Sequence, residues 1–392
     1  MGYSKYILLQ RLGAILLTGC FILAVVGCSR SPKVLSQKDD TNDITGNFYL
    51  PAKANPGDPG LLFAELLYPL DDKPTPQCHA STIVETDRGL AVAFFAGTHE
   101  KHPDVGIWFS RMENNTWSRP IEVANGVMDE ETRYPCWNPV LFQPSTGPLM
   151  LFYKVGPSPM EWWGMLMTST DGGQTWSEPR KLGEDPTIGH LLGPIKNKPV
   201  ELANGILISP SSTEEVGEET LWRVHFEISK DMGETWEVIG PINDGEEFDA
   251  IQPSILVHDP QRLQILCRTR ENVIATSFSE DAGRTWSDLK GTELPNPNSG
   301  TDAVTLTDGR HLLVYNHSTK EGEEPKGRNL LNLAISADGE EWLPVMTLED
   351  EPIRAGYAYP AIIQSRDGLV HITYTYNRES IKYMLVDPSV FD

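Results

Sequence analysis

Short apolar runs alternate with polar turns along most of the chain, and one arrangement of them returns six times. Each copy begins with a polar residue, usually followed by Pro. It continues as an apolar strand, a turn that often contains Gly or Asp, and a second strand rich in Val, Leu, Phe and Tyr. The copies begin at His79, Asn138, Lys198, Gln252, Asp302 and Tyr359. Apolar runs of this length between turn residues predict strands that are joined in hairpins.

A second repeat lies between these copies. The pattern Ser-x-Asp-x-Gly-x-Thr-Trp stands intact at 169–176, 229–236 and 279–286, with two worn copies at 110–117 and 336–342. Asp and Ser fold their short side chains onto nearby backbone amides, and Gly accepts a positive φ, so each copy predicts a tight hairpin. The tryptophans of the five copies recur every 50 to 60 residues. A period of this length is typical of propellers and other repeat arrays.

The two repeats together predict an all-β fold. We expect residues 61–392 to form a six-bladed β-propeller, in which each blade is a four-stranded antiparallel sheet. The Ser-Asp pattern follows each of the first five copies but not the sixth. We therefore expect a strand near residues 61–68 to complete the sixth blade, and no helix of note.

The first residues of the chain differ in composition from the repeats. Lys5 and Arg11 precede or open a mostly apolar run that extends to residue 26, and residues 25–28 resemble a bacterial lipobox. We expect residues 1–28 to be an export signal that is cleaved before Cys28, whose sulfur then carries a lipid; an uncleaved membrane anchor is the alternative. Residues 29–60 predict a flexible tether. The mature protein is expected outside the cytoplasm, anchored to the periplasmic or surface side of the bacterial cell envelope.

Charge and cysteine content limit the possible partners. The net charge of −23 would repel nucleic-acid phosphates, so we expect no nucleic-acid partner. Cys78, Cys136 and Cys267 follow the predicted signal without metal-like spacing, and they allow at most one disulfide. The histidines also lack the spacing of metal ligands. We expect a monomer that needs neither a metal nor a cofactor.

Polar residues recur where a propeller would place them around its axis. The first strand of each blade lies nearest the axis, so the first residues of the six copies should form a ring. The ends of the second strands add Lys154, Ser212, Arg268, Arg270, Asn316 and Arg378. Any one of these could be a satisfied polar residue at the channel mouth, where burial would otherwise favour apolar side chains. The whole set favours a ligand site on this face.

The Ser-Asp pattern and its spacing resemble the Asp boxes, or BNR repeats, of the sialidase (neuraminidase) superfamily. Sialidases bind a sugar carboxylate with three arginines, attack with a tyrosine that a glutamate activates, and use an aspartate as the acid. Arg268 matches the second arginine, Arg328 the third, and Tyr359 the tyrosine. The resemblance implies that these two arginines pair with a carboxylate through their guanidinium forks and that Tyr359 is the nucleophile.

Two positions depart from the family's pattern. His79 stands where sialidases carry the first arginine, and Gln252 stands where they carry the activating glutamate. Gln cannot take a proton from Tyr, and His is a weaker, pH-dependent partner for a carboxylate. Glu100 or Asp104 falls at the acid position, and Arg133 is the candidate replacement for the missing arginine. The chain therefore resembles the bacterial and plant group that is labelled "predicted neuraminidase".

Three functions fit these residues. The first is an exported glycoside hydrolase that removes a terminal acidic sugar, a sialic or uronic acid, from glycans. The second is a lyase in which His79 or Tyr359 takes the proton beside a uronate carboxylate, and the third is a glycan-binding propeller without chemistry. The catalytic candidates are Tyr359, Glu100, Asp104, His79 and Gln252, and the substrate-binding candidates are Arg268, Arg270, Arg328, Arg133, Asn138, Lys154, Lys198, Asp302 and Asn316.

Overall fold

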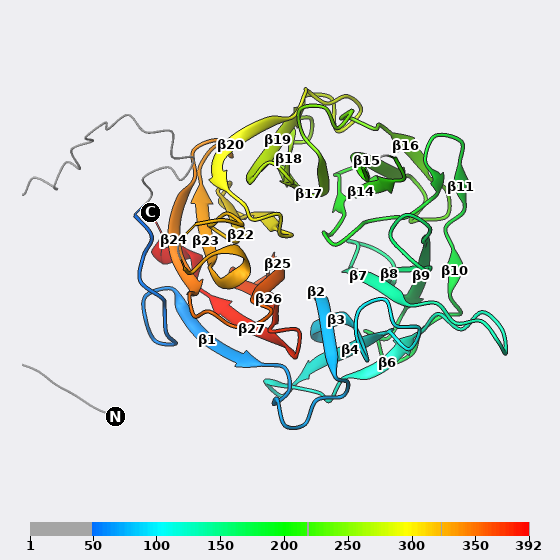
Figure 1. The fold of residues 1–392 in the computed structure, drawn as a ribbon, viewed down its shortest axis with the longest axis horizontal. Helices are drawn as coiled ribbons and strands as arrows, with labels where there is room; N and C mark the ends of the chain where they lie inside the picture. Colours follow the sequence, from blue (N-terminus) through cyan, green and yellow to red (C-terminus); the bar gives the residue numbers. More distant parts are fainter. Residues whose placement is uncertain (1–48, 218, 323, 392) are drawn as a thin grey trace, which may run out of the picture. The chain divides into compact units, whose positions relative to one another are not determined.

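The computed structural model describes residues 49–217, 219–322 and 324–391. Six antiparallel sheets stand around one axis in chain order, like the blades of a propeller (Figure 1). The predicted all-β six-bladed fold is therefore confirmed. The helices among the described residues are two short 3-10 turns, η1 (Gly327–Asn329) and η2 (Pro388–Val390).

Each blade runs from an inner strand beside the axis to an outer strand at the rim (Figure 1). Blade 1 contains β2 (Gln77–Thr86), β3 (Gly89–Gly97), β4 (Gly106–Glu113) and β6 (Ile121–Ala124), and the short β5 (Thr116–Trp117) also pairs with β4. Blade 2 contains β7 (Cys136–Phe142), β8 (Leu149–Val155), β9 (Trp163–Ser169) and β10 (Arg180–Lys181). Blade 3 contains β13 (Val200–Glu201), β14 (Leu207–Glu215), β15 (Leu221–Ser229) and β16 (Glu237–Ile239). Blade 4 contains β17 (Ala250–Val257), β18 (Leu263–Thr269), β19 (Val273–Ser279) and β20 (Lys290–Pro295); blade 5 contains β21 (Asp302–Thr305), β22 (His311–Tyr315), β23 (Leu331–Ser336) and β24 (Leu343–Glu349); blade 6 contains β25 (Tyr357–Gln364), β26 (Val370–Tyr376), β27 (Ser380–Val386) and β1 (Leu61–Leu66). A small hairpin of β11 (Glu184–Asp185) and β12 (Gly189–His190) connects blades 2 and 3 along the chain.

The strand β1 closes blade 6, as the sequence predicts. It pairs antiparallel with β27, so that Leu61 lies opposite Val386. Just before β1, Lys53 forms a parallel bridge with Thr347 on the outer strand of blade 5, and its Nζ lies 3.0 Å from a carboxylate oxygen of Glu349. Residues 53–66 therefore join blade 5 to blade 6.

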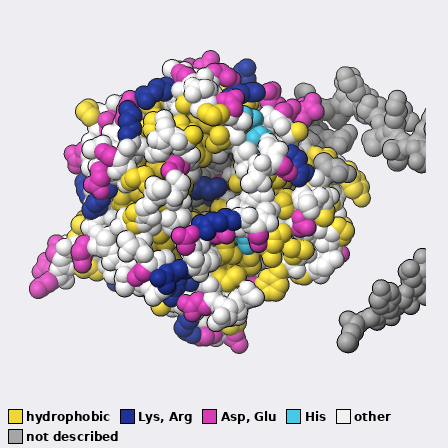
Figure 2. Space-filling view, turned by 180° about the vertical axis from the view of Figure 1, so that it is seen from behind, with side chains coloured by type: hydrophobic (Ala, Val, Ile, Leu, Met, Phe, Trp, Pro, Cys, Tyr) yellow, Lys and Arg dark blue, Asp and Glu magenta, His cyan; other side chains and the backbone are white. Residues whose placement is uncertain are grey.

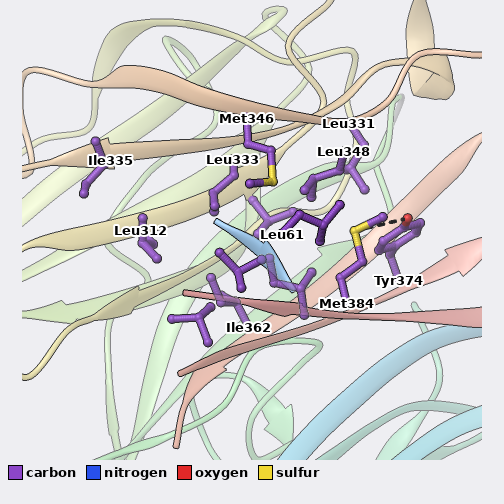
Figure 3. Packing of buried hydrophobic residues seen from close by; sticks show 14 of the residues in the cluster. Leu61, Leu312, Leu331, Leu333, Ile335, Met346, Leu348, Ile362, Tyr374 and Met384 are labelled. Carbon is purple, nitrogen blue, oxygen red and sulfur yellow. Dashed lines mark hydrogen bonds between the residues drawn. The ribbon is translucent and has the colours of Figure 1, made fainter. Parts of the chain in front are cut away.

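An apolar seam between blades 5 and 6 holds this closing strand. Leu61 lies among Leu312 and Leu333 of blade 5 and Ile362 and Met384 of blade 6 (Figure 3). All five side chains are almost fully buried. Burial of one such side chain contributes about 1.5–3 kcal/mol, so the seam stabilises the closure of the ring.

The three intact Asp boxes form the predicted hairpins. In the copy at 229–236, Ser229 Oγ accepts a hydrogen bond from the N–H of Gly233 at 2.7 Å. Asp231 accepts from the N–H and the hydroxyl of Thr235 at 2.8 and 2.6 Å. The same three bonds recur in the copies at 169–176 and 279–286. The bonds from Thr235 lower the pKa of the Asp231 carboxyl, so an ionised carboxylate holds the turn.

The tryptophan that ends each intact box packs against the blade before its own. Its partner is a phenylalanine in a middle strand of that blade, and the ring centroids lie 5.4 Å apart for Trp176 and Phe109, 6.0 Å for Trp236 and Phe152, and 4.3 Å for Trp286 and Phe226. Aromatic pairs at these distances attract one another beyond their area burial. The boxes therefore join neighbouring blades as well as shaping the hairpins.

Three cysteines lie in the propeller. Cys78, Cys136 and Cys267 are buried free thiols in three different blades, and burial raises the pKa of each. No helix among the described residues has the length and apolar character needed to cross a membrane. The export signal, the lipidated Cys28 and the tether up to residue 48 lie outside the described residues, and those expectations stay predictions.

Candidate active site

Four inner strands share one backbone irregularity. In β2, β7, β17 and β25, the pairing with the second strand slips by one residue, and a non-glycine residue at the slip has a positive φ. These residues are Ala80 (56°), Asn138 (39°), Gln252 (57°) and Tyr359 (53°). A left-handed non-glycine residue costs about 1–3 kcal/mol and is concentrated at functional sites, where bulges re-aim side chains. The recurrence in four blades indicates a site at the inner ends of the blades.

The observed register revises the predicted ring. In blade 1 the residue equivalent to Tyr359 is Ala80, and His79 precedes it in the position opposite Phe95. In blade 3 the left-handed residue is Lys196 (φ 69°), after Ile195, whose N–H bonds to β14. Ala80 and Lys196 therefore occupy the positions that the sequence assigned to His79 and Lys198. The inner strand of blade 1 has no Pro, and in blade 3 the left-handed Lys196 precedes Pro199 by three residues instead of one, so alignment on Pro misplaced both.

The phenol oxygen of Tyr359 accepts two hydrogen bonds. Arg268 Nη1 donates to it at 3.0 Å, and Gln252 Nε2 donates to it at 3.2 Å. Arg268 Nη1 also lies 3.3 Å from Gln252 Oε1. A guanidinium has only donors, so this contact fixes the amide with its NH2 group toward Tyr359. Gln252 therefore does not accept the Tyr359 proton, which is directed elsewhere.

Two arginines contact this tyrosine, and a third arginine, from another blade, lies close enough to act on them. Arg268, at the end of β18, donates through Nε to Asn298 Oδ1 at 2.6 Å, and the guanidinium of Arg328 lies 5.8 Å from the centre of the Tyr359 ring. Arg378, in the turn after β26, donates to Glu100 Oε2 at 2.6 Å. Burial lowers the pKa of Arg328 to about 10, and repulsion from Arg268 and Arg378 adds to that effect. Arg328 is therefore repelled by the other two arginines, and a bound anion would offset this repulsion.

His79 lies against the same tyrosine. The two ring centroids are 4.2 Å apart, and His79 Nδ1 is 3.0 Å from the hydroxyl oxygen of Thr375. Burial holds the pKa of His79 well below its usual value, and Arg378, Arg328, Arg268 and Lys196 lower it further. His79 is therefore an uncharged imidazole at neutral pH and not a cationic partner for a carboxylate.

Lys196 lies in the floor of the site. Its Nζ donates to the carbonyl of Thr301 at 2.5 Å, to the carbonyl of Pro360 and to Asn197 Oδ1 at 2.8 Å. Burial lowers the pKa of Lys196 to about 7. Because Pro360 follows Tyr359, this lysine anchors the backbone that carries the tyrosine. A Cβ on Gly300 would lie only 3.2–3.5 Å from atoms of Gln252, Lys196 and Tyr359, so a glycine fits this floor best.

The charge of the site contrasts with that of the whole protein. The chain carries a net charge of −23, yet four cationic side chains act on His79. In the space-filling view, Lys and Arg side chains lie in a hollow at the middle of one face of the propeller, with acidic side chains beside them (Figure 2). A local cationic site on an acidic protein selects a compact anion by contact rather than by long-range attraction.

The two predicted acids have different surroundings. Asp104 accepts bonds from the N–H and hydroxyl of Thr98 at 3.0 and 2.6 Å, and His102 Nδ1 lies 2.8 Å away. Burial alone would raise the pKa of Asp104, but these bonds outweigh it and lower the pKa, so Asp104 is ionised at neutral pH. Glu100 is one-third exposed and binds Arg378 directly. Of the two, Glu100 is the one in contact with the arginine cluster.

Several predicted binding residues make their polar contacts with other parts of the protein. Arg270 bonds to Asp249 and to the carbonyl of Thr220, and Arg133 donates to the carbonyl of Asp104 at 3.0 Å. Lys154 is fully buried against the carbonyl of Pro194. The structure therefore gives these three cations protein partners.

Three more predicted residues connect the blades. Lys198 of blade 3 lies 3.0 Å from Asp302 of blade 5, and Asp302 also accepts from Ser254 of blade 4 and the N–H of Ile362 of blade 6. Asn316 donates to the carbonyl of Tyr357 at 3.0 Å, close along the chain to Tyr359. These contacts hold four blades together at the axis. Asn138 lies at the bulge of β7, in the position equivalent to that of Tyr359 in β25.

Sequence reasoning missed two residues of the site. Arg378 stands at the predicted end of a second strand, where the sequence pattern indicates no specific role for it. The pattern does not include Glu214, because its strand, β14, runs three residues beyond the predicted end at Ser212. Burial raises the pKa of Glu214, and Arg268 acts against this increase. The polar residues after Ser212 were the available signal.

Fold and site together define a sialidase-like propeller. The chain belongs to the family described as BNR repeat-like domain, which matches residues 88–372. A curated sialidase from Bacteroides fragilis (strain YCH46) is 26% identical over 213 residues, which are 51% of this chain and 37% of that protein. The chain thus matches little more than a third of that relative's length.

Solved structures share the fold at low sequence identity. A protein of unknown function from Dyadobacter fermentans superposes with a TM-score of 0.69 at 17% identity, over 83% of this chain and 98% of that chain. A Hadza microbial sialidase gives 0.70 at 19% identity, over 83% and 69%. The NanB sialidase from Streptococcus pneumoniae gives 0.64 at 14% identity, over 86% and 71%. Identities this low show the common fold alone.

Proposed function

We propose that the protein binds a glycan that ends in an acidic sugar, a sialic or uronic acid, and cleaves that sugar from it. The observation that supports this proposal is a cluster of three arginines: Arg268 bonds to Tyr359, Arg328 lies over its ring, and Arg378 acts on Arg328. Guanidinium groups pair with carboxylates through parallel charged hydrogen bonds. A sugar carboxylate would relieve the mutual repulsion of the arginines, and Arg378 takes the part that His79 cannot.

In this proposal a hydrolase is the first candidate. Hydrolysis breaks the glycosidic C–O bond, and water supplies the hydroxyl to the sugar and the proton to the leaving oxygen. Tyr359 is the group that faces the anomeric carbon, because a neutral phenol approaches an anionic sugar without charge repulsion. Glu100 is the nearby carboxylate that can exchange a proton with the substrate, since it is partly exposed beside Arg378.

A uronate lyase is the second candidate, and the bond from Gln252 to Tyr359 favours it. In an elimination, a base takes the proton beside the carboxylate, its electron pair forms a double bond, and the glycosidic oxygen leaves with a proton. His79 is the candidate base once a bound carboxylate offsets the cations that lower its pKa. The hydroxyl of Tyr359, whose proton Gln252 does not accept, is the candidate to protonate the leaving oxygen. The arginines would neutralise the carboxylate.

Product mass separates these candidates. The protein and its Tyr359→Phe variant are incubated with a fluorogenic sialic acid glycoside and with uronic acid oligosaccharides, and the products are weighed by mass spectrometry. Products whose summed mass exceeds the mass of the substrate by one water identify a hydrolase. Products that include an unsaturated sugar and whose summed mass equals that of the substrate identify a lyase. Binding without any product would overturn the proposal and leave a glycan-binding propeller. The predicted export and lipid anchor at Cys28 suit a site that meets glycans outside the cytoplasm.

A further inference from the structure

Residues 192–197 lead into the first strand of blade 3, and we call them the floor segment because they contain Lys196. Lys196 and Asn197 are the two polar residues of this segment, and they are only 3% and 1% exposed. Buried polar groups need partners within the protein. The partners of these two side chains therefore show what the floor segment holds.

The bulges of blades 4 and 6 leave backbone groups outside the sheets. The pairing with the second strand skips residues 252–253 in β17 and residues 359–360 in β25. The carbonyls of Gln252 and Pro360 therefore have no paired residue across the sheet. Buried carbonyls need donors, so a bulge of this kind is stable only where another part of the chain supplies them.

The floor segment supplies these donors. Asn197 Nδ2 donates to the carbonyl of Gln252 at 2.9 Å. Lys196 Nζ donates to the carbonyl of Pro360 and, at 2.5 Å, to the carbonyl of Thr301, just before the first strand of blade 5. One segment of blade 3 therefore binds the backbone of blades 4, 5 and 6. Two of these contacts lie at the bulges that carry Gln252 and Tyr359.

Buried charges from blades 2 and 3 hold the floor segment itself. Glu227, in β15, accepts the N–H of Leu192 and the N–H of Gly193 through its two carboxylate oxygens, both at 2.8 Å. Lys154, in β8, donates to the carbonyl of Pro194. Glu227 and Lys154 are fully buried. Hydrogen bonds to buried charges are strong and costly to break, so these two side chains fix the backbone of the floor segment.

We propose that Lys196 and Asn197 are positioning residues that hold the bulges of β17 and β25 and thereby aim Tyr359. Glu227 is a third positioning residue, which acts through the backbone of the floor segment. The proposal rests on the proposed function, because it takes Tyr359 to be the group that reacts. It extends the site to a carboxylate in the interior of blade 3 that takes no part in the chemistry.

A positioning role has a kinetic signature. The arginine cluster stands outside the two bulges, on β18, on η1 and in the turn after β26. A displaced floor segment should therefore misplace the phenol and spare the binding of a carboxylate. A misplacement of about 1 Å can cost about 10²-fold in rate. A general loss of stability, in contrast, changes neither the kcat nor the affinity of the molecules that remain folded.

The first test is Asn197→Ala, with Asn332→Ala as its matched control. Asn332 of blade 5 is equally buried and donates to Thr347 Oγ1 at 2.9 Å, on the outer strands of its sheet. We expect kcat for a fluorogenic acidic-sugar glycoside to fall about 10- to 100-fold in Asn197→Ala, and the affinity for the acidic monosaccharide to stay within about threefold. Asn332→Ala should leave kcat within about twofold. Equal losses of kcat in both variants would overturn the proposal.

The second test is Glu227→Gln, which keeps the size of the side chain. An amide has only one oxygen, so one of the two N–H groups loses its acceptor and Lys154 loses a nearby anion. We expect kcat to fall by at least about fivefold with little change in affinity. Glu349→Gln makes the same change at an equally buried carboxylate, bound to Lys53 and Lys382, and should not affect kcat. Affinity that falls as much as kcat in Glu227→Gln would contradict a positioning role.

A measurement without substrate separates this inference from the proposed function. Tyr359 is replaced by 3-fluorotyrosine through site-specific incorporation, and its fluorine resonance is recorded in the parent protein and the variants. We expect Asn197→Ala and Glu227→Gln to shift or broaden this resonance, and Asn332→Ala to leave it unchanged. If the parent protein neither binds nor cleaves acidic sugars, the proposed function is wrong, yet the resonance still tests the positioning of Tyr359. An unchanged resonance in both variants would overturn the inference alone.

Discussion

Gln252 donates a hydrogen bond to Tyr359, with Nε2 and the phenol oxygen 3.2 Å apart. A carboxylate at residue 252 would accept the phenol proton instead, so one amide reverses the direction of this contact. We expect Gln252→Glu to increase hydrolytic turnover at least about tenfold, since a positioned general base contributes about 10²–10⁴-fold. Turnover of a fluorogenic acidic-sugar glycoside measures this, with Gln252→Met as the variant that can make neither bond. Turnover by Gln252→Glu that equals the turnover of the parent protein would show that Tyr359 does not need a base here.

Removal of the Tyr359 hydroxyl should stop catalysis and spare binding. Tyr359→Phe keeps the ring but loses the oxygen that faces Arg268 and Gln252. We expect turnover to fall by about 10²–10⁴-fold, while the affinity for the acidic sugar changes by only a few fold. Tyr357→Phe is the matched control, because the Tyr357 hydroxyl bonds to the carbonyl of Glu351. Equal losses in both variants would mean that the effect is structural.

Arg378 should contribute to carboxylate binding, whereas Arg270 should not. Arg378→Met removes one of the three guanidinium groups of the arginine cluster, and a charged hydrogen bond is worth about 1.5–3 kcal/mol, or roughly 10- to 100-fold in affinity. Arg270→Met removes an arginine that is bound to Asp249, and we expect its effect on affinity to stay within about threefold. Calorimetry with the acidic monosaccharide checks both. A weak effect of Arg378→Met would limit the cluster to two arginines.

Stability should fall as the pH drops from 6.5 to 4.5. Burial lowers the pKa of three histidines to about 4 and that of a fourth well below 6.5; they are His311, His317, His371 and His79. Unfolded histidines take up protons near pH 6.5 while these stay neutral, so the unfolded state binds more protons and gains stability. Thermal unfolding at several pH values measures the slope, and His371→Gln should reduce it by about one proton. A flat profile would contradict the buried neutral histidines.

An Asp box should fail when its serine is removed. Ser229→Ala leaves the buried N–H of Gly233 without its acceptor at 2.7 Å, which should cost about 1–3 kcal/mol of unfolding free energy. Urea unfolding measures the loss. Ser389→Ala, at an exposed turn near the end of blade 6, is the control and should change stability by less than about 0.5 kcal/mol. Equal effects would show that the box is not a stabilising unit.

The fold could be predicted because its repeats are local. Ser229, Asp231 and Gly233 build one hairpin within five residues, so the sequence pattern carries the geometry directly. The contact of Trp286 with Phe226 of the preceding blade could not be read in this way, because it depends on how two blades pack. The spacing of the six sequence copies also placed Tyr359, Gln252 and Arg268 at matching ends of three strands.

The rest of the site depends on backbone details that the pattern does not contain. Arg378 reaches the cluster from a turn in which Asn377 and Arg378 both have positive φ, and nothing in the residue types fixes the direction of that turn. Ala80, and not His79, occupies the position equivalent to Tyr359, because the bulge in β2 lies at Ala80 and only the strand register shows this. The polar residues at the ends of the predicted strands therefore indicated that a site exists, but not which residues form it.

The pairing of β1 with β27 sets an order on the folding of the chain. These strands stand at opposite ends of the propeller sequence, so their contact has a very large sequence separation. Contacts of this kind form late, because the entropy of closing the intervening loop is lost before the pairing rewards it. Until β27 exists, Leu61 and the apolar face of β1 have no partner strand in blade 6. Among the strands that the structure describes, the first to be synthesised is therefore the last to be placed.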